Sequence, residues 1–299
     1  KLMADELGVD SVASLKEAAL NNQLAPMKGF GAKSQQRMLD GIELLSRFRA
    51  RRRLDIGLRY GEAFQRKIAT LDGVHRATLA GSARRRKDTI GDLDVVVAVD
   101  EENHESVANA ILNLPGIADV KGAGDSKISL ILDTSIFDDS FTVGHIDANV
   151  LDAIGGDDYE QLEAGGTIDA QVRIVPPHVE PFTLAYFTGS KEHNIAMRQR
   201  AIDRGLRLNE FGLIPEAKAG ELKGLEAAAF SLAATDEAAI YAHLDLAYVP
   251  PELREDMGEV QAAHDGTLPH LIETAHIRGA LHNHTTLSDG EASLEVMAD

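Results

Sequence analysis

The order of apolar and polar positions divides the chain into a helical first part and a mixed second part. Up to about residue 72 the apolar residues recur at helical spacing. Ser11 is placed to cap a helix that ends near residue 20, and Ser34 is placed to cap a longer one that runs toward residue 49. Met38, Ile42 and Leu45 would share one face of the longer helix. The pattern predicts a helical hairpin region over residues 1–72.

From about residue 73 the pattern changes to short β-branched runs, which are typical of strands. Prolines at 176 and 177 end this part, and a helical pattern follows through residue 204. Residues 250–275 hold three prolines and few periodic apolar residues, which indicates a linker. The pattern predicts an α+β domain with a mixed or antiparallel sheet. Its strands would cover residues 74–80, 92–99, 126–132, 141–150 and 167–175, and its helices residues 104–114 and 157–164.

Composition narrows the functional classes. The 299 residues include 44% hydrophobic residues and no cysteine, which predicts cores without disulfides and a cytoplasmic protein. We find no apolar run long enough for a membrane span and no signal peptide at the start of the chain. The net charge of −18 argues against a nucleic-acid coat over the whole surface. Residues 27–53 nevertheless carry eight cations against two carboxylates, a pattern that fits either DNA contact or a solvated helix face.

The most informative stretch is residues 81–97. Asp92 and Asp94 are two apart on a predicted strand, so they point to the same face and can hold the same metal ions. A Gly81-Ser82 turn and four cations from Arg84 to Lys87 lie just upstream, where a metal-bound polyphosphate would lie. A surface strand can carry Asp-x-Asp without a metal, but the adjacent turn and cations favour nucleotidyl transfer.

Two glycine-containing segments flank this stretch. Gly29-Phe30-Gly31 enters a helix beside Lys33, and such a turn can offer backbone N–H groups to a phosphate. Tyr-Phe-Thr-Gly-Ser at residues 186–190 precedes a helix that Ser190 can cap. That helix would place Asn194 and Arg198 on one face, where they can reach base edges or sugars.

Together, Gly-Ser-x-Arg-Arg, Gly-Asp-x-Asp and Tyr-Phe-Thr-Gly-Ser resemble the palm and thumb of family X DNA polymerases. The resemblance implies a nucleotidyltransferase-type palm over residues 73–180 and a thumb over 181–249, with a helix-hairpin-helix-like DNA-binding region over 1–72. It implies that Asp92 and Asp94 bind two Mg²⁺ or Mn²⁺ ions. The implied nucleotide-binding residues are Gly81, Ser82, Arg85, Gly91, Tyr186, Phe187, Gly189 and Asn194, and the implied DNA-binding residues are Gly29, Gly31, Lys33 and Arg198.

A third motif lies near the end of the chain. His282 and His284 are spaced by one residue, so on a strand they share a face, and Asp289 follows in the next turn. The string over residues 278–290 resembles the opening of PHP phosphoesterase domains, which follow the thumb in bacterial and archaeal family X polymerases. The resemblance implies Zn²⁺ or Mn²⁺ ligands at His282, His284 and Asp289 and a 3′–5′ exonuclease. Because the further ligands of such a site would follow residues 276–299, we expect no exonuclease activity from this chain alone.

The third palm carboxylate breaks the family pattern. In the family this residue accepts the proton of the primer 3′-hydroxyl and stands two residues before an arginine that leads into proline. Counting back from Arg173 gives Gln171, whereas Asp169 lies one step farther along the same face. A bulge in the strand could bring Asp169 into the site, the site could be weakened, or Asp147 in Ile146-Asp147-Ala148 could serve instead.

These observations predict a template-directed, gap-filling repair polymerase that takes gapped or nicked DNA and a deoxynucleoside triphosphate and acts as a monomer. A DNA-end-binding scaffold with a weakened palm is the alternative. A nucleotidyltransferase for a small molecule or RNA is disfavoured by the basic hairpin and by the Tyr-Phe-Thr-Gly-Ser segment.

Overall fold

The computed structural model describes residues 2–27, 29–49, 51–124, 126–135, 166–218, 224–279 and 284–298. A five-stranded sheet forms its centre, in the order β2-β4-β7-β6-β5. Strands β4 and β7 run parallel, and the other neighbours run antiparallel, so the sheet is mixed as predicted. The strands are β2 (Val74–Leu79), β4 (Asp92–Val99), β5 (Ile117–Ala123), β6 (Lys127–Asp133) and β7 (Thr167–Val175).

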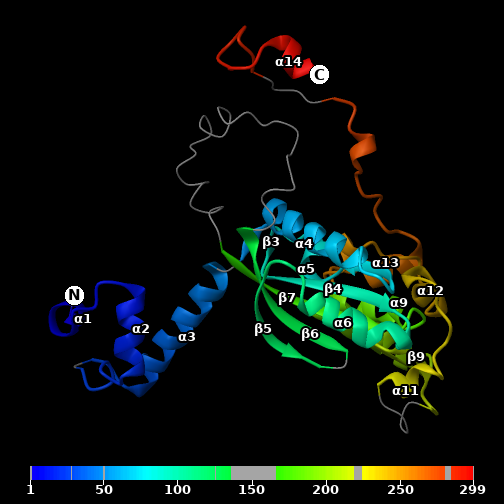
Figure 1. Cartoon of the computed structure of the whole chain (residues 1–299), viewed down its shortest axis with the longest axis horizontal. Coiled ribbons are helices and arrows are strands. Elements are labelled where there is room, and N and C mark those ends of the chain that lie inside the picture. Colours follow the sequence, from blue (N-terminus) through cyan, green and yellow to red (C-terminus); the bar gives the residue numbers. More distant parts are fainter. Residues whose placement is uncertain are drawn as a thin grey trace.

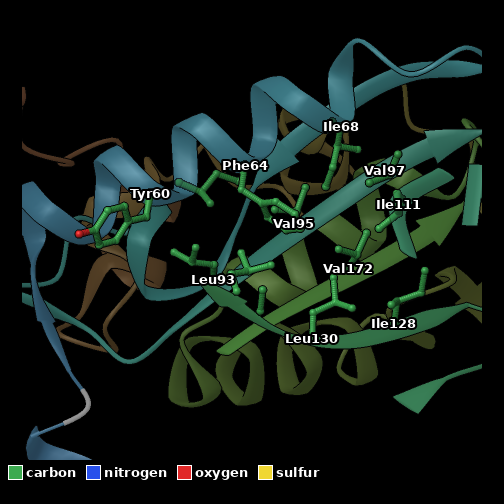
Figure 2. Close-up of a cluster of buried hydrophobic side chains, with 14 of the residues drawn as sticks. Tyr60, Phe64, Ile68, Leu93, Val95, Val97, Ile111, Ile128, Leu130 and Val172 are labelled. Carbon is green, nitrogen blue, oxygen red and sulfur yellow. The ribbon is translucent and has the colours of Figure 1, made fainter. Parts of the chain in front are cut away.

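Two helices cover one face of this sheet and a third covers part of the other (Figure 1). Helix α4 (Leu54–Ala69) buries Tyr60, Phe64 and Ile68, which recur every fourth residue and so form one apolar stripe. With α6 (His104–Leu112) they pack on Leu93, Val95 and Val97 of β4 (Figure 2). Each fully buried side chain of this size contributes about 1.5–3 kcal/mol. On the opposite face α9 (Glu180–Thr188) packs against Val96 and Val175.

The thumb predicted over residues 181–249 includes α9 and continues with α10 (Lys191–Ile202). The Ser190 side chain accepts a hydrogen bond from the backbone N–H of His193, as predicted for the cap of α10. A small hairpin of β8 (Leu206–Asn209) and β9 (Gly212–Pro215) comes next, followed by α11 (Leu225–Ala228) and α12 (Glu237–His243). Phe182, Met197, Leu213 and Tyr241 are among the buried residues that join these elements in one core.

The N-terminal helices are α1 (Leu2–Leu7), α2 (Val12–Leu20) and α3 (Ala32–Arg49), which lie to one side of the sheet in Figure 1. Ser11 caps α2 as predicted. The prediction for Ser34 is wrong, because α3 begins at Ala32 and Ser34 therefore lies inside the first turn. The short strands β1 (Arg52–Arg53) and β3 (Thr89–Ile90) pair and connect this region to the start of β4.

The segment predicted as a linker starts with ordered structure. It contains η3 (Pro251–Leu253), α13 (Glu259–Asp265) and η4 (Thr274–His276), and Arg254 between the first two is fully buried. Helix α14 (Leu294–Ala298) lies near the end of the chain, and η1 (Glu101–Asn103) and α5 (Gly81–Arg84) flank β4. The strand expected over 141–150, the helix over 157–164 and Asp147 lie outside the described residues. Among the residues that are described, no helix is both long and apolar enough to cross a bilayer.

Candidate active site

The candidate site lies at the start of β4, on the part of one strand face that α9 does not cover. Leu93, Val95 and Val97 point into the core, whereas Asp92 and Asp94 are partly exposed on the other face. Farther along that same face Val96 packs under α9. The strand therefore presents two carboxylates at the point where the covering helix ends, as the alternation predicted.

The chain turns sharply into α5 directly beside these carboxylates. The backbone N–H of Ala80 donates to the Asp94 carbonyl at 2.7 Å, and Gly81 then adopts a φ of +61°. A Cβ atom on Gly81 would lie 2.3 Å from Asp94 Oδ2. Only glycine permits both this conformation and this close approach, so the Gly-Ser turn has a steric reason to precede the aspartates.

An open cleft of about 490 Å³ extends from this turn to the start of α10. It gathers side chains from β4, α5, α9 and α10, which are far apart in the sequence. Of the residues predicted to bind metal, nucleotide or template, it includes Gly81, Ser82, Arg85, Asp92, Asp94, Tyr186, Phe187, Gly189, Asn194 and Arg198. It also includes Arg51, Lys87 and Lys191, to which the sequence had assigned no individual role.

Gly91, predicted to bind nucleotide, is not among the residues that line the cleft, but it lies close to Arg51, which does line it. A Cβ atom on Gly91 would lie 2.8 Å from Arg51 Nη1. Arg51 is fixed by Thr89, whose hydroxyl accepts from Nε at 2.8 Å and whose carbonyl accepts from Nη2 at 2.6 Å. Glycine at this position therefore leaves room for a cation beside the carboxylates. The basic cluster over residues 27–53 was the signal in the sequence for Arg51.

The two aspartates are in an environment that disfavours their charge. Burial and the charge of Asp92 raise the pKa of Asp94 to about 7, against the opposing effect of Arg173, Arg85 and Lys127. Burial also raises the pKa of Asp92, with Arg51 opposing the shift and Asp169 adding to it. A divalent cation would favour the ionised form of both groups. Oxygen ligands of this kind suit Mg²⁺ or Mn²⁺, so the donor pair fits such an ion.

The third carboxylate is placed by the pairing of β4 with β7. Asp92 is opposite Asp169 and Asp94 is opposite Gln171, in a register that continues without interruption to Ala98 and Val175. All residues of β4 and β7 are described, and the bulge considered from the sequence does not occur between these two strands. Asp169 shares the face of Asp92 without a shift, but it is more than half exposed and does not line the cleft.

Asp169 is instead bound by a lysine of the edge strand. Lys121 Nζ on β5 lies 2.7 Å from both carboxylate oxygens of Asp169. Within the described part of the chain, no three His, Asp or Glu side chains are gathered closely enough to hold a metal ion. Asp92 and Asp94 are thus the carboxylates that line the cleft, whereas Asp169 lies next to Asp92 on the sheet and forms an ion pair with Lys121.

The opposite wall of the cleft comes from α9 and α10. Tyr186 and Phe187 meet edge to face with ring centroids 5.2 Å apart. Asn194 Nδ2 donates to the Tyr186 carbonyl at 2.7 Å, and Arg198 Nε donates to the Asn194 carbonyl at 3.2 Å. The predicted common face of Asn194 and Arg198 is confirmed, and these bonds tie it to the aromatic pair.

The other predicted residues lie elsewhere. Gly29 has a φ of +87° in the turn before α3, Gly31 directly precedes that helix, and Lys33 is exposed in its first turn. His284 Nδ1 lies 2.5 Å from Asp289 Oδ1. His282 lies outside the described residues, so the proposed phosphoesterase ligand set is seen only in part.

Comparisons with known proteins bear on the family and the fold of the chain. A family model described as DNA polymerase beta thumb matches residues 183–255. The chain is 33% identical over 294 residues to the DNA polymerase/3'-5' exonuclease PolX of Bacillus subtilis (strain 168). The chain is a relative of the family X DNA polymerases. The resemblance predicted from the motifs is thereby confirmed. The match to the PolX protein covers 98% of this chain but only 44% of the relative.

Solved structures support the fold. Two structures of Leishmania infantum polymerase beta, a ternary P/T complex and a ternary gap complex, align with TM-scores of 0.54 and 0.56 at 18% identity. Each alignment covers 85% of this chain, with 91% and 83% of the respective neighbour. The α+β fold with a mixed sheet and a thumb is therefore of the polymerase-beta type. The helix-hairpin-helix and PHP assignments stay predictions.

Proposed function

We propose that the chain is the polymerase part of a family X type repair enzyme, which fills gaps in DNA by template-directed nucleotidyl transfer. The observation that carries the proposal is the cleft itself. It brings two carboxylates, several cations and the Tyr186–Arg198 wall together around one open space. The carboxylates, through bound metal ions, and the cations would hold the triphosphate, and the wall would contact the sugar and the base.

Asp92 and Asp94 would hold two Mg²⁺ or Mn²⁺ ions. Bound there, the ions would neutralise charge on the transferring phosphoryl group and orient it for in-line displacement. Ser82, Arg85 and Lys87 would hold the triphosphate through hydrogen bonds and charge. Asp169 would accept the proton of the primer 3′-hydroxyl, for which it must release Lys121.

The wall from α9 and α10 would select the nucleotide. Tyr186 and Phe187, with Gly189, would line the sugar pocket and exclude a 2′-hydroxyl group, which selects deoxynucleotides. Asn194 would meet the incoming base and Arg198 the template. The bond from Asn194 to the Tyr186 carbonyl couples these two functions, because a shift of one moves the other.

DNA would be the macromolecular partner. The structural neighbours are complexes of polymerase beta named for a P/T substrate and a gap, and we extend that substrate class to this chain. The turn with Gly29 and Gly31 would contact the DNA backbone, with Lys33 beside it. We expect the chain to act as a monomer.

We further propose that His282, His284 and Asp289 begin a PHP phosphoesterase site. The PolX relative is named as a 3'-5' exonuclease as well as a polymerase, and more than half of that protein lies beyond the match. His284 and Asp289 are already paired in this structure. Zn²⁺ or Mn²⁺ would be the metal of such a site when its remaining ligands are present.

One observation favours the alternative of a DNA-end-binding scaffold. Gln171 lies opposite Asp94, at the position two residues before Arg173 where the family carries a carboxylate. Asp169 is bound by Lys121 outside the cleft. An amide is a poor Mg²⁺ ligand and no base. A palm in this state would bind DNA and nucleotide but transfer slowly.

Primer extension on DNA with a one-nucleotide gap separates the two functions. With Mg²⁺ or Mn²⁺ the chain should incorporate the templated deoxynucleotide. Asp92→Ala should lower the rate by at least ~100-fold, because a metal ligand contributes several kcal/mol to the transition state. Gap binding by the variant should persist in a mobility-shift measurement.

Glu105→Ala is the matched control, since Glu105 is an exposed carboxylate on α6, outside the cleft. It should leave both readouts unchanged. No incorporation by the unmodified chain with either metal, together with intact gap binding, would contradict the polymerase and support the scaffold. Full activity of Asp92→Ala would contradict the metal assignment.

A further inference from the structure

The last residues of the segment that matches the thumb model return to the cleft, where Glu255 places a carboxylate behind two of its cations. Glu255 Oε1 accepts a hydrogen bond from Arg85 Nε at 2.8 Å, and Glu255 Oε2 lies 3.4 Å from Lys87 Nζ. Both cations line the cleft, whereas Glu255 is not among its lining residues. One acidic residue outside the cleft therefore contacts two cations that face into it.

Arg85 is held at two edges of its guanidinium group. Besides the bond from Nε to Glu255, its Nη1 donates to the Thr188 carbonyl at 2.5 Å. A guanidinium group has five N–H donors, so three remain for an anion in the cleft. The side chain is only 14% exposed, which limits its other conformations. A guanidinium group held in this way loses little further side-chain conformational entropy when it binds a phosphate.

The backbone that carries Glu255 is itself anchored. The neighbouring Arg254 is fully buried, and its Nη1 donates to Glu237 Oε1 at 2.6 Å. The Arg254 carbonyl accepts from the backbone N–H of Ser190 at 2.9 Å. Glu237 also accepts from Arg84 at 2.5 Å. Consecutive arginines, at the end of α5 and directly after it, are thus bound by two acids, one on the thumb helix α12 and one after η3.

The geometry distinguishes positioning from competition. A carboxylate that competed with a triphosphate would occupy the cleft and take the donors that face into it. Glu255 takes the Nε edge of Arg85 from outside the cleft and leaves N–H donors of the same group free for an anion. The negative charge of Glu255 disfavours an incoming polyphosphate. The hydrogen bond that Glu255 accepts from Arg85, however, fixes the guanidinium group that would bind the polyphosphate.

We propose that Glu255 is a positioning residue of the nucleotide site, which holds Arg85 and Lys87 in place for the triphosphate of the incoming nucleotide. The inference rests on the proposed function and adds a residue from the end of the matched thumb segment to the palm site. It also makes triphosphate binding depend on the segment that leads from the thumb toward the C-terminal part of the chain.

Two substitutions separate the hydrogen bond from the charge. Glu255→Ala removes both, whereas Glu255→Gln keeps an oxygen that can accept from Arg85 Nε. We expect Glu255→Ala to raise the KM for dCTP about tenfold on a gap with a templating dG. The kcat should change by less than about twofold, because the lost interaction would stabilise the bound nucleotide and the transition state equally. Glu255→Gln should stay within about threefold of the unmodified KM. Glu252→Ala is the control, because Glu252 is an exposed acid of the same segment.

A binding measurement keeps this test separate from polymerase activity. Inorganic tripolyphosphate titrated into the full chain should bind about tenfold more weakly to Glu255→Ala than to Glu255→Gln or Glu252→Ala. If the variants show this order of tripolyphosphate affinities but the unmodified chain incorporates no nucleotide, the proposed function fails and the positioning role stands. If the chain polymerises and Glu255→Ala equals the control, or if both Glu255 variants bind more tightly, Glu255 is not a positioning residue.

Discussion

At the scale of single residues, the site shows which contacts a sequence pattern can reveal. The common face of Asp92 and Asp94 follows from strand alternation alone. The need for glycine at position 81 does not, because it depends on Asp94 Oδ2 lying where a Cβ atom would be. The ion pair of Lys121 with Asp169 also had no signal, since Lys121 belongs to an edge strand that the pattern did not predict.

The third carboxylate gives a prediction at this scale. Asp169 lies opposite Asp92 on the same face of the sheet and is the proposed general base, so Asp169→Asn should lower nucleotide incorporation by at least ~100-fold, the order expected for loss of a general base. Gln171→Asp should give no gain, because the base is already supplied by the neighbouring position. Single-turnover primer extension checks both. A strong gain from Gln171→Asp, with Asp169→Asn still active, would instead identify a palm weakened at position 171.

At the scale of elements, the periodic parts of the chain could be predicted and the polar anchors could not. Helix α10 after Ser190 and strands β4 and β7 appear within a residue or two of their expected bounds. Strand β5 was missed because its residues are mostly exposed and lack apolar alternation. Residues 250–265 lack periodic apolar positions because buried polar contacts hold them, among them those of Arg254 and Glu259.

Helices α10, α12 and α13 meet at one buried histidine. His193 Nδ1 lies 2.5 Å from Glu259 Oε1, and Nε2 lies 2.9 Å from the Tyr241 hydroxyl. This pattern suits a neutral ring that donates to Glu259 and accepts from Tyr241. Burial lowers the pKa of His193, against the opposing effect of the bond to Glu259. The folded thumb therefore binds this proton less readily than the unfolded chain does.

The sign of the pH dependence follows. The unfolded histidine takes up a proton below about pH 6.5, while the folded one stays neutral to lower pH. The stability from His193 is thus complete above that pH and is lost as pH falls. Thermal unfolding should show a Tm that drops from about pH 7.5 to about pH 5.5, and His193→Gln should reduce that drop. His243→Gln, at an exposed thumb histidine, is the control. An equal drop in all three proteins would contradict the assignment.

At the scale of the whole molecule, the chain combines an acidic total with local basic surfaces. Its net charge of −18 would repel DNA if it were spread evenly. The cations over residues 27–53 and those of the cleft, including Arg51 and Lys87, offset this locally. Since Arg51 belongs to both groups, the basic segment reaches from the turn before α3 to the candidate active site. Average charge could not reveal this arrangement, because it contains no information on position.

Salt dependence tests whether the hairpin end of this surface binds DNA. Removing one cation that pairs with a phosphate of duplex DNA makes the slope of log affinity against log salt shallower by about 0.9. Lys33→Ala should reduce the slope for a gapped duplex by about that amount, because Lys33 is exposed beside the Gly29–Gly31 turn. Lys218→Ala removes another exposed lysine, from the thumb side, and should leave the slope unchanged. Fluorescence anisotropy between low and moderate salt measures both. Equal slopes for the Lys33 variant and the unmodified chain would remove this lysine from the interface, and contact through the cleft cations would then have to account for the salt dependence of DNA binding.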